Sequence, residues 1–187
     1  MLAVPRGAVP MGALIADALD GELDVVLVHK VGAPSNPEYA IGAVDELGGV
    51  LEREDARPVD RRWLAAEEAR QIARLRAARR AWAPGREALP VTDRVVILVD
   101  DGVATGATLH AAVELVRRGR PRRLVVAVPV APPHAIARLR QVADEVLCLE
   151  ERADLLGVGE AYADFRQVSD AEVTATLLRG TTPASSR

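Results

Sequence analysis

Short, continuous apolar runs alternate along the chain with longer segments of helical periodicity. Residues 23–28, 95–99 and 124–130 have the pattern of buried strands, and residues 145–149 form a weaker fourth candidate. Strands that are apolar throughout, rather than alternating, are typical of a sheet covered on both faces. The helical segments between them complete a strand–helix rhythm, so the sequence predicts an α/β fold with a mainly parallel central sheet flanked by helices.

Helices are predicted at residues 9–19, 108–118 and 132–143. The second of these has apolar side chains at i, i+3, i+4 and i+7 from Leu109, and Gly119 follows where a C-terminal cap is expected. The second and third helices fall between predicted strands, as parallel pairing requires. The first follows the start of the chain, LAVP, which reads as part of a strand.

A longer segment, residues 60–82, is highly charged and has a helical pattern. The pattern favours an amphipathic helix with a solvated arginine face. Arg70 and Arg74 fall on that polar face, whereas the apolar face carries Leu64, Ile72, Leu75 and Trp82.

Composition narrows the class of protein. With 187 residues the chain fits a single domain, which we place at residues 1–180, followed by a disordered tail at 181–187. The net charge of −3 argues against a nucleic-acid-binding surface, and the single cysteine, Cys148, excludes an internal disulfide framework. We see neither a membrane-length apolar run nor a signal peptide, so we expect a cytoplasmic protein without a membrane partner.

The segment 95–109, VVILVDDGVATGATL, carries the clearest chemistry. A buried strand delivers Asp100 and Asp101 to the carboxyl edge of the sheet, where ligands bind in open α/β folds. A loop of small residues and a helix start follow, which suit a phosphate group. The carboxylates suit sugar hydroxyls or a hydrated Mg²⁺, so a phosphorylated sugar fits both ends. Ordinary turn and cap chemistry is the alternative for the Asp pair alone.

The same segment resembles the phosphoribosyl pyrophosphate signature of type I phosphoribosyltransferases. The resemblance implies that Asp100 and Asp101 hold the ribose hydroxyls, with Mg²⁺ near them only through substrate or water. The substrate-binding residues that follow, the last five of which would cradle the 5′-phosphate, are Gly102, Val103, Ala104, Thr105, Gly106, Ala107 and Thr108.

The start of the chain, LAVPRGAVP, resembles the pyrophosphate-binding loop of this family, in which a strained or cis peptide often exposes backbone N–H groups. The resemblance places Arg6, Gly7 and Ala8 at the diphosphate, with Arg6 as a catalytic group. A plain turn is the alternative for this segment alone. Family members usually carry a further helical segment before the first strand, and this sequence begins without one. We expect either a misassigned start or a missing element of the hood.

Lys30 is the only lysine among 24 basic residues, and the sequence predicts it just after a buried strand at the ligand edge. There the family places a basic residue facing the diphosphate, so Lys30 is the second catalytic candidate. His29 replaces the arginine that often precedes it. The strings 32–44 and 158–165 narrow the resemblance to a bacterial and archaeal group of phosphoribosyltransferases with an unassigned acceptor.

The resemblance implies a Mg²⁺-dependent transfer of phosphoribosyl from phosphoribosyl pyrophosphate to a nitrogenous base, with pyrophosphate released. In the 6-oxopurine enzymes of the family, an aspartate at the position of Ala104 handles the purine proton. Ala104 cannot transfer a proton, so the resemblance excludes that mechanism but does not identify the acceptor base. A small C-terminal hood at residues 150–180 would recognise the acceptor, with Tyr162 or Phe165 stacking on it. Packing of the hood onto the core is an equal explanation for both aromatics.

Family members also close a mobile loop over the diphosphate, and residues 60–90 stand at its place, so an arginine from this segment is a further candidate. We expect a homodimer.

A binding protein that senses phosphoribosyl pyrophosphate or a nucleotide, without catalysis, is the alternative function. A dinucleotide-dependent oxidoreductase is excluded, because no G-x-G-x-x-G follows a predicted strand.

Overall fold

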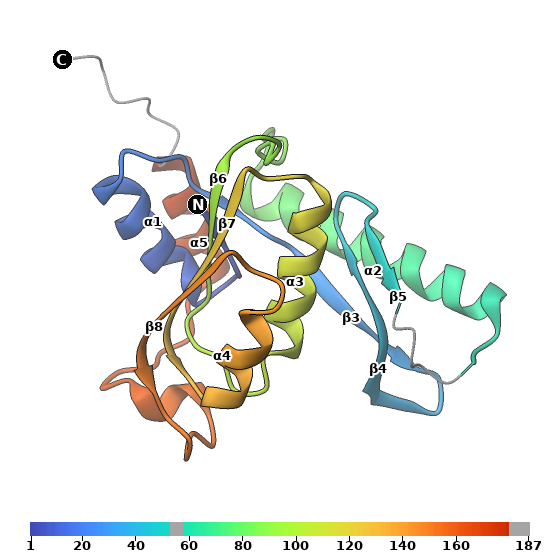
Figure 1. The fold of residues 1–187 in the computed structure, drawn as a ribbon. Helices are drawn as coiled ribbons and strands as arrows, with labels where there is room; N and C mark the ends of the chain where they lie inside the picture. Colours follow the sequence, from blue (N-terminus) through green and yellow to red (C-terminus); the bar gives the residue numbers. More distant parts are fainter. Residues whose placement is uncertain (53–57, 180–187) are drawn as a thin grey trace.

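Five parallel strands form the central sheet in the order β2–β1–β6–β7–β8 (Figure 1). The computed structural model describes residues 1–52 and 58–179, so the tail predicted at 181–187 lies outside the described residues. Every neighbouring pair in this sheet is parallel, which confirms the predicted fold class. The strands are β1 (Leu2–Ala3), β2 (Asp24–Val25), β6 (Val95–Val99), β7 (Arg123–Ala131) and β8 (Glu145–Glu151).

Helices cover both faces of the sheet (Figure 1). On one face α3 (Ala107–Arg118) and α4 (Pro133–Leu139) pack over buried residues of β6 and β7. On the other, α1 (Ala8–Ala18), α2 (Arg61–Trp82) and α5 (Asp170–Arg179) enclose a second cluster against β1 and β6. None of the helices in the described residues is long and apolar enough to cross a lipid bilayer.

A second, antiparallel sheet was not predicted. Its strands are β3 (Val28–Ala33), β4 (Asn36–Asp45) and β5 (Val50–Glu52), and it packs between α2 and α3. The single strand predicted at residues 23–28 is therefore wrong. The Val26 amide still bonds to Ala3 of the first sheet, whereas Val28 already pairs with Asp45 of the second. The apolar run continues across the point where the chain leaves the first sheet for the second, so the hydrophobic pattern does not show where this change occurs.

Helix α2 begins as its sequence predicts, with the Asp60 carboxylate accepting hydrogen bonds from the Arg62 and Trp63 amides. The apolar face of this helix, however, also carries a charged residue. Arg79 is 8% exposed and donates to Glu46 at 2.6 and 2.7 Å and to Asp24 at 2.8 Å. This buried ion-pair network lies away from the face of Arg70 and Arg74, and it ties α2 to both sheets.

The C-terminal region divides into two parts. Residues 152–169, with a 3₁₀ turn η1 (Val158–Ala161), continue from the end of β8 near the carboxyl edge of the sheet. Helix α5 instead returns to the core, where Val173 and Leu177 are completely buried beside α1 and α2. The segment at the sheet edge is thus shorter than the hood expected at 150–180, and we use the word hood below for residues 152–169.

Candidate functional site

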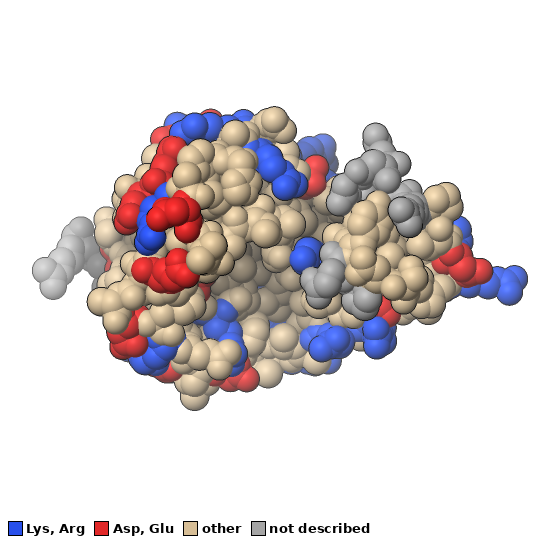
Figure 2. Space-filling model, turned by 90° about the horizontal axis from the view of Figure 1, so that it is seen from below, with Lys and Arg blue, Asp and Glu red and all other residues tan. Residues whose placement is uncertain are grey.

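Two adjacent carboxyl groups stand at the carboxyl end of β6. The Asp100 amide still pairs with Ala127 of β7 at 3.2 Å, and the Asp101 amide donates to Asp100 Oδ1 at 2.9 Å. Figure 2 views the molecule from below, the side to which the carboxyl ends of the parallel strands point in Figure 1. That face is hollowed near its middle, and basic side chains lie at several places around the hollow (Figure 2).

These two carboxyl groups are electrostatically coupled. Burial and the neighbouring Asp101 carboxylate raise the pKa of Asp100 to about 8. Burial also raises the pKa of Asp101, although its side chain accepts a hydrogen bond from Asp100. At neutral pH the pair therefore holds one proton in the free protein. A ligand that favours two negative charges would displace this proton to solvent.

The loop after the acids is anchored at Val103 and open at its tip. Val103 is buried and its amide donates to Val130 at 2.9 Å, whereas Ala104 and Thr105 are exposed. Gly106 adopts a left-handed conformation, φ 75°, as it caps the next helix. Helix α3 begins at Ala107, one residue before its predicted start, and the amides of its first turn have no acceptor within the helix.

The predicted diphosphate loop lies directly against the acids. The peptide bond between Pro5 and Arg6 is cis, which agrees with the expectation of a strained or cis peptide in this loop. A side-chain carbon on Gly7 would collide with Asp101 Oδ2, so only glycine fits at this position without a shift. Ala8, which opens α1, is completely buried and does not face the hollow with its methyl group.

Arg6 forms an ion pair with Asp170 at the start of α5, with Nη1 at 3.3 Å from Oδ1. The Arg6 side chain is one-third exposed, so this pairing leaves it accessible from the hollow. Asp170 is a residue that sequence analysis did not single out. The helix that it begins was not predicted either, and the sequence gives no indication of a partner near the chain start.

A cavity of about 570 Å³ joins the first loop, Asp101 and the hood. Three segments that are distant in the sequence converge here, since β1 and β6 are neighbours in the sheet. Sequence analysis predicted five of its lining residues: Arg6, Gly7, Asp101, Tyr162 and Phe165. It missed six others, of which Pro5 and Asp164 lay in motifs that it had quoted; they are Pro5, Met11, Asp164, Arg166, Gln167 and Val168.

The two hood aromatics have different surroundings. The Tyr162 hydroxyl donates to the backbone oxygen of Asp101 at 2.5 Å, and burial and both acids raise the pKa of this hydroxyl. Phe165 is 50% exposed, and its ring centroid lies 5.1 Å from that of Tyr162. Packing onto the core thus accounts for Tyr162, whereas Phe165 keeps half of its surface open beside the cavity.

Lys30 does not follow a strand of the parallel sheet, as predicted, but lies inside β3 opposite Ala43. In an extended strand it shares a face with Val28, which packs with Ala43 against Ala111 of α3. Lys30 therefore lies on the side of the second sheet that faces α3, and it does not line the cavity described above. Its neighbour His29 has a lowered pKa, caused by burial and then by Arg74 of α2.

The residues present fit a magnesium ion that arrives with a ligand. The described residues contain no group of three or more His, Cys, Asp or Glu side chains that could hold a metal by themselves. Two adjacent carboxylates are nevertheless hard oxygen donors of the kind that Mg²⁺ binds, usually together with substrate phosphates and water. Asp100 and Asp101 are accordingly the candidates for such an indirect contact.

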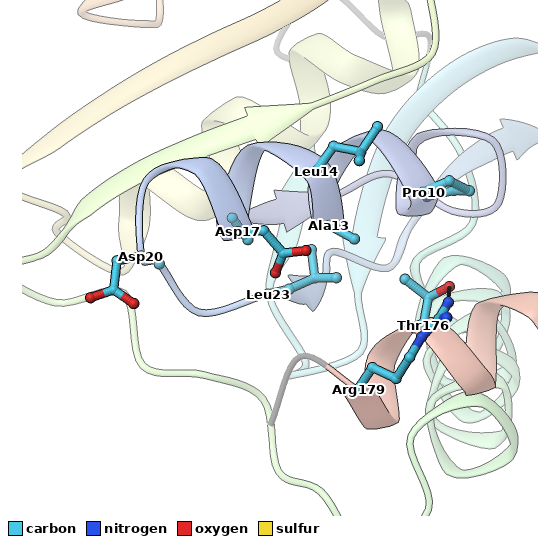
Figure 3. Close-up of a pocket in the computed structure, with 10 residues that line it drawn as sticks. Pro10, Ala13, Leu14, Asp17, Asp20, Leu23, Thr176 and Arg179 are labelled. Carbon is cyan, nitrogen blue, oxygen red and sulfur yellow. Dashed lines mark hydrogen bonds between the residues drawn. The ribbon is translucent and has the colours of Figure 1, made fainter. Parts of the chain in front are cut away.

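A larger cavity, of about 720 Å³, lies elsewhere (Figure 3). It is formed by α1, the turn that leads to β2 and the last turns of α5, so it stands near the amino ends of the strands. Asp17 and Asp20 approach it from α1 and the following turn, and Arg179 approaches from α5 with a hydrogen bond to Thr176. None of the predicted site residues lines it.

Comparisons with known proteins agree with this geometry. The phosphoribosyl transferase domain model matches residues 1–164. The crystal structure of TT1426 from Thermus thermophilus is 47% identical in sequence, covers 97% of this chain and 87% of that chain, and superposes with a TM-score of 0.88. A shorter match, 38% identity over 74 residues, joins 34% of this chain to 42% of the bifunctional protein PyrR of Ralstonia nicotianae.

Rv0571c of Mycobacterium tuberculosis, which carries a provisional name as a phosphoribosyl transferase, is 39% identical over 182 residues. The match takes in 96% of this chain but 41% of that protein, so the chain spans about two-fifths of the length of this curated relative. The domain match over residues 1–164 identifies the chain as a member of the phosphoribosyl transferase domain family, and the parallel central sheet agrees with it.

Proposed function

We propose that the protein transfers a phosphoribosyl group from phosphoribosyl pyrophosphate to a nitrogenous base and releases pyrophosphate. The observation that supports this most directly is the contact between the Gly7 backbone and the Asp101 carboxylate, which joins the predicted diphosphate loop to the predicted ribose site. Both lie on one cavity with a half-open aromatic ring, so donor and acceptor would meet there.

In the proposed reaction a nitrogen of the acceptor forms a bond to carbon 1 of the ribose. The bond from carbon 1 to the diphosphate oxygen breaks, and its electron pair leaves with pyrophosphate. Asp100 and Asp101 would hold the ribose hydroxyls, and the exposed loop tip at Ala104 and Thr105 would hold the 5′-phosphate with the amides of the α3 start. Mg²⁺ bound to the diphosphate would supply positive charge to the leaving group.

Negative charge grows on the diphosphate as the bond breaks, so a cation that faces it lowers the barrier more than it strengthens ground-state binding. Arg6 is the candidate from the first loop, and Lys30 is the candidate from the second sheet. Acceptor selection is assigned to the hood, with Phe165 as the stacking surface. Ala104 carries no proton-transfer group, so the proton that the acceptor nitrogen releases would pass to solvent.

A non-catalytic sensor is the second candidate function, supported by the partial match to a protein named as bifunctional. Binding and turnover separate the two functions. Donor binding is measured by calorimetry with phosphoribosyl pyrophosphate and Mg²⁺, and pyrophosphate release is measured with adenine, guanine, hypoxanthine, uracil and orotate in turn. Release with at least one base supports the transferase, binding without release supports the sensor, and absence of donor binding overturns both.

Two variants test the assigned roles. Asp101→Asn is expected to weaken donor binding by about tenfold or more, because a charge-assisted hydrogen bond contributes about 1.5–3 kcal/mol. Lys30→Ala is expected to lower kcat by a larger factor than it weakens donor binding. Asp17→Asn, in the cavity of Figure 3, is the matched control and should change neither quantity. Equal losses of rate and affinity in Lys30→Ala would remove Lys30 from the catalytic machinery.

A further inference from the structure

The hood contacts the turn after β6 at the peptide unit between Asp101 and Gly102. The Tyr162 hydroxyl donates to the carbonyl oxygen of this unit at 2.5 Å and lies 3.9 Å from Met11 Sδ. On the other side, Val158 of η1 packs so closely over Gly102 that a side-chain carbon there would collide with it. Two residues of the hood therefore clasp the turn that carries the donor acids.

The same peptide unit also fixes the donor side of the cavity. The side chain of Asp101 rests against Gly7, and its carbonyl holds Tyr162. One residue thus connects the diphosphate loop with the hood. A displacement of the Asp101 backbone would therefore move the carboxylate and the hood together.

Phe165 depends on this clasp for its position. Its ring lies 5.1 Å from the Tyr162 ring at an angle of 40°, and its edge contacts the backbone of Gly159, where a side-chain carbon would lie 3.0 Å from the ring. The supported face leaves the other part of the ring open, and Phe165 is 50% exposed. The open ring is therefore held in place from Asp101 through Tyr162.

We propose that Tyr162 is a positioning residue that sets the distance between the bound donor and the acceptor surface of the hood. The proposal rests on the proposed function for its kinetic consequences, but the clasp itself is a property of the free protein. Its hydroxyl acts through Asp101 and Phe165 and touches neither substrate. Removal of the hydroxyl loosens the acceptor surface and leaves the carboxylates that hold the donor in place.

Tyr162→Phe removes only this hydroxyl and keeps the ring contact with Phe165. With the base that the wild type converts fastest, kcat/KM for the base is expected to fall by about 5- to 30-fold, the range of one lost hydrogen bond with imperfect positioning. The Kd of phosphoribosyl pyrophosphate should stay within about twofold, because the donor contacts remain. Tyr39→Phe, on β4, is the matched control and should leave both unchanged.

A second measurement does not depend on turnover. Amide hydrogen exchange in the free protein should be faster in Tyr162→Phe than in the wild type at residues 152–169, with unchanged exchange in β6 and β7. Unchanged exchange in the hood, or a rise in donor Kd equal to the rise in acceptor KM, would overturn the proposal. Failure of the wild type to convert any base would overturn the proposed transferase instead, and the exchange experiment would then decide the role of Tyr162.

Discussion

At the scale of single residues, Asp100 links the charge of the site to pH. Its pKa of about 8 in the free protein comes from burial and from the Asp101 carboxylate beside it. A donor that brings hydroxyl groups and Mg²⁺ favours the ionised pair, so binding should lower this pKa and release a proton. Donor affinity is therefore expected to rise from pH 6 to pH 8 and to level off above it.

Calorimetry in two buffers of different ionisation enthalpy measures the released proton at pH 7. The phosphate of the donor also titrates, near pH 6, so Asp100→Asn is needed as the control. This variant should lose the part of the pH dependence that belongs to Asp100.

The pKa of Asp100 is higher in the folded protein than in the unfolded chain, so the folded state loses stability as the pH rises from about 4 to about 8. At pH 8 the same variant should therefore unfold at a higher temperature than the wild type.

Gly7 gives a steric test of the contact between the two donor loops. Gly7→Ala is expected to displace the Asp101 carboxylate, because the new methyl group would occupy the position of Oδ2. Donor binding should weaken by at least about tenfold, by analogy with the cost of a misplaced binding group. Gly85→Ala is a glycine control in open space, although its φ of 73° carries its own backbone cost. Wild-type donor affinity in Gly7→Ala would contradict the contact.

Sequence analysis found individual site residues but not the contacts between them. A strand followed by two acids and a loop of small residues places Asp100 and Asp101 at a sheet edge by local rules alone. The contacts of Gly7 and Tyr162 with Asp101 join residues far apart in the chain, and they exist only because β1 and the hood pack beside β6. Local patterns contain no information on such packing.

At the scale of elements, α2 is anchored by Arg79. Arg79→Ala is expected to lower the free energy of unfolding by about 3–5 kcal/mol, because two buried carboxylates, Asp24 and Glu46, would lose their common partner. Arg80→Ala, at an exposed position one residue later, should change stability by about 0.5 kcal/mol or less. Urea denaturation followed by circular dichroism measures both.

The pH dependence of this loss identifies its cause. Burial raises the pKa of Glu46 and Arg79 opposes that rise. Without the guanidinium the Glu46 carboxyl favours its protonated form more strongly, so the destabilisation of Arg79→Ala should be smaller at pH 5 than at pH 8. A loss that is the same at both pH values would point to lost packing of the Arg79 stem instead of uncompensated charge.

The second sheet shows why elements were harder to predict than fold class. Residues 95–99 and 124–130 form strands within a residue of where their apolar runs lie. Residues 28–52 were not predicted as three strands, since β3 continues the apolar run of β2 and β4 contains Pro37 and Gly42. The Gly48–Gly49 pair, which lies in the turn between β4 and β5, was the available hairpin signal.

At the scale of the whole molecule, donor binding should stabilise the folded state. Phosphoribosyl pyrophosphate with Mg²⁺ at 100 times its Kd adds about 2.7 kcal/mol, which corresponds to a rise in Tm of about 5–10 °C for a chain of this size. Asp101→Asn at the same concentration should show a clearly smaller rise. An unchanged Tm in the wild type, measured by differential scanning calorimetry, would contradict donor binding at any site.

The position of β1 in the sheet has a consequence for how the chain is made. β1 leaves the ribosome before both of its neighbours in the sheet, β2 and β6, and β6 begins only at Val95. About half of the chain must therefore emerge before β1 can gain its second neighbour, and non-local pairing of this kind is slow to form. We expect the nascent amino-terminal half to remain an incomplete sheet, exposed to chaperones, until translation has passed β6.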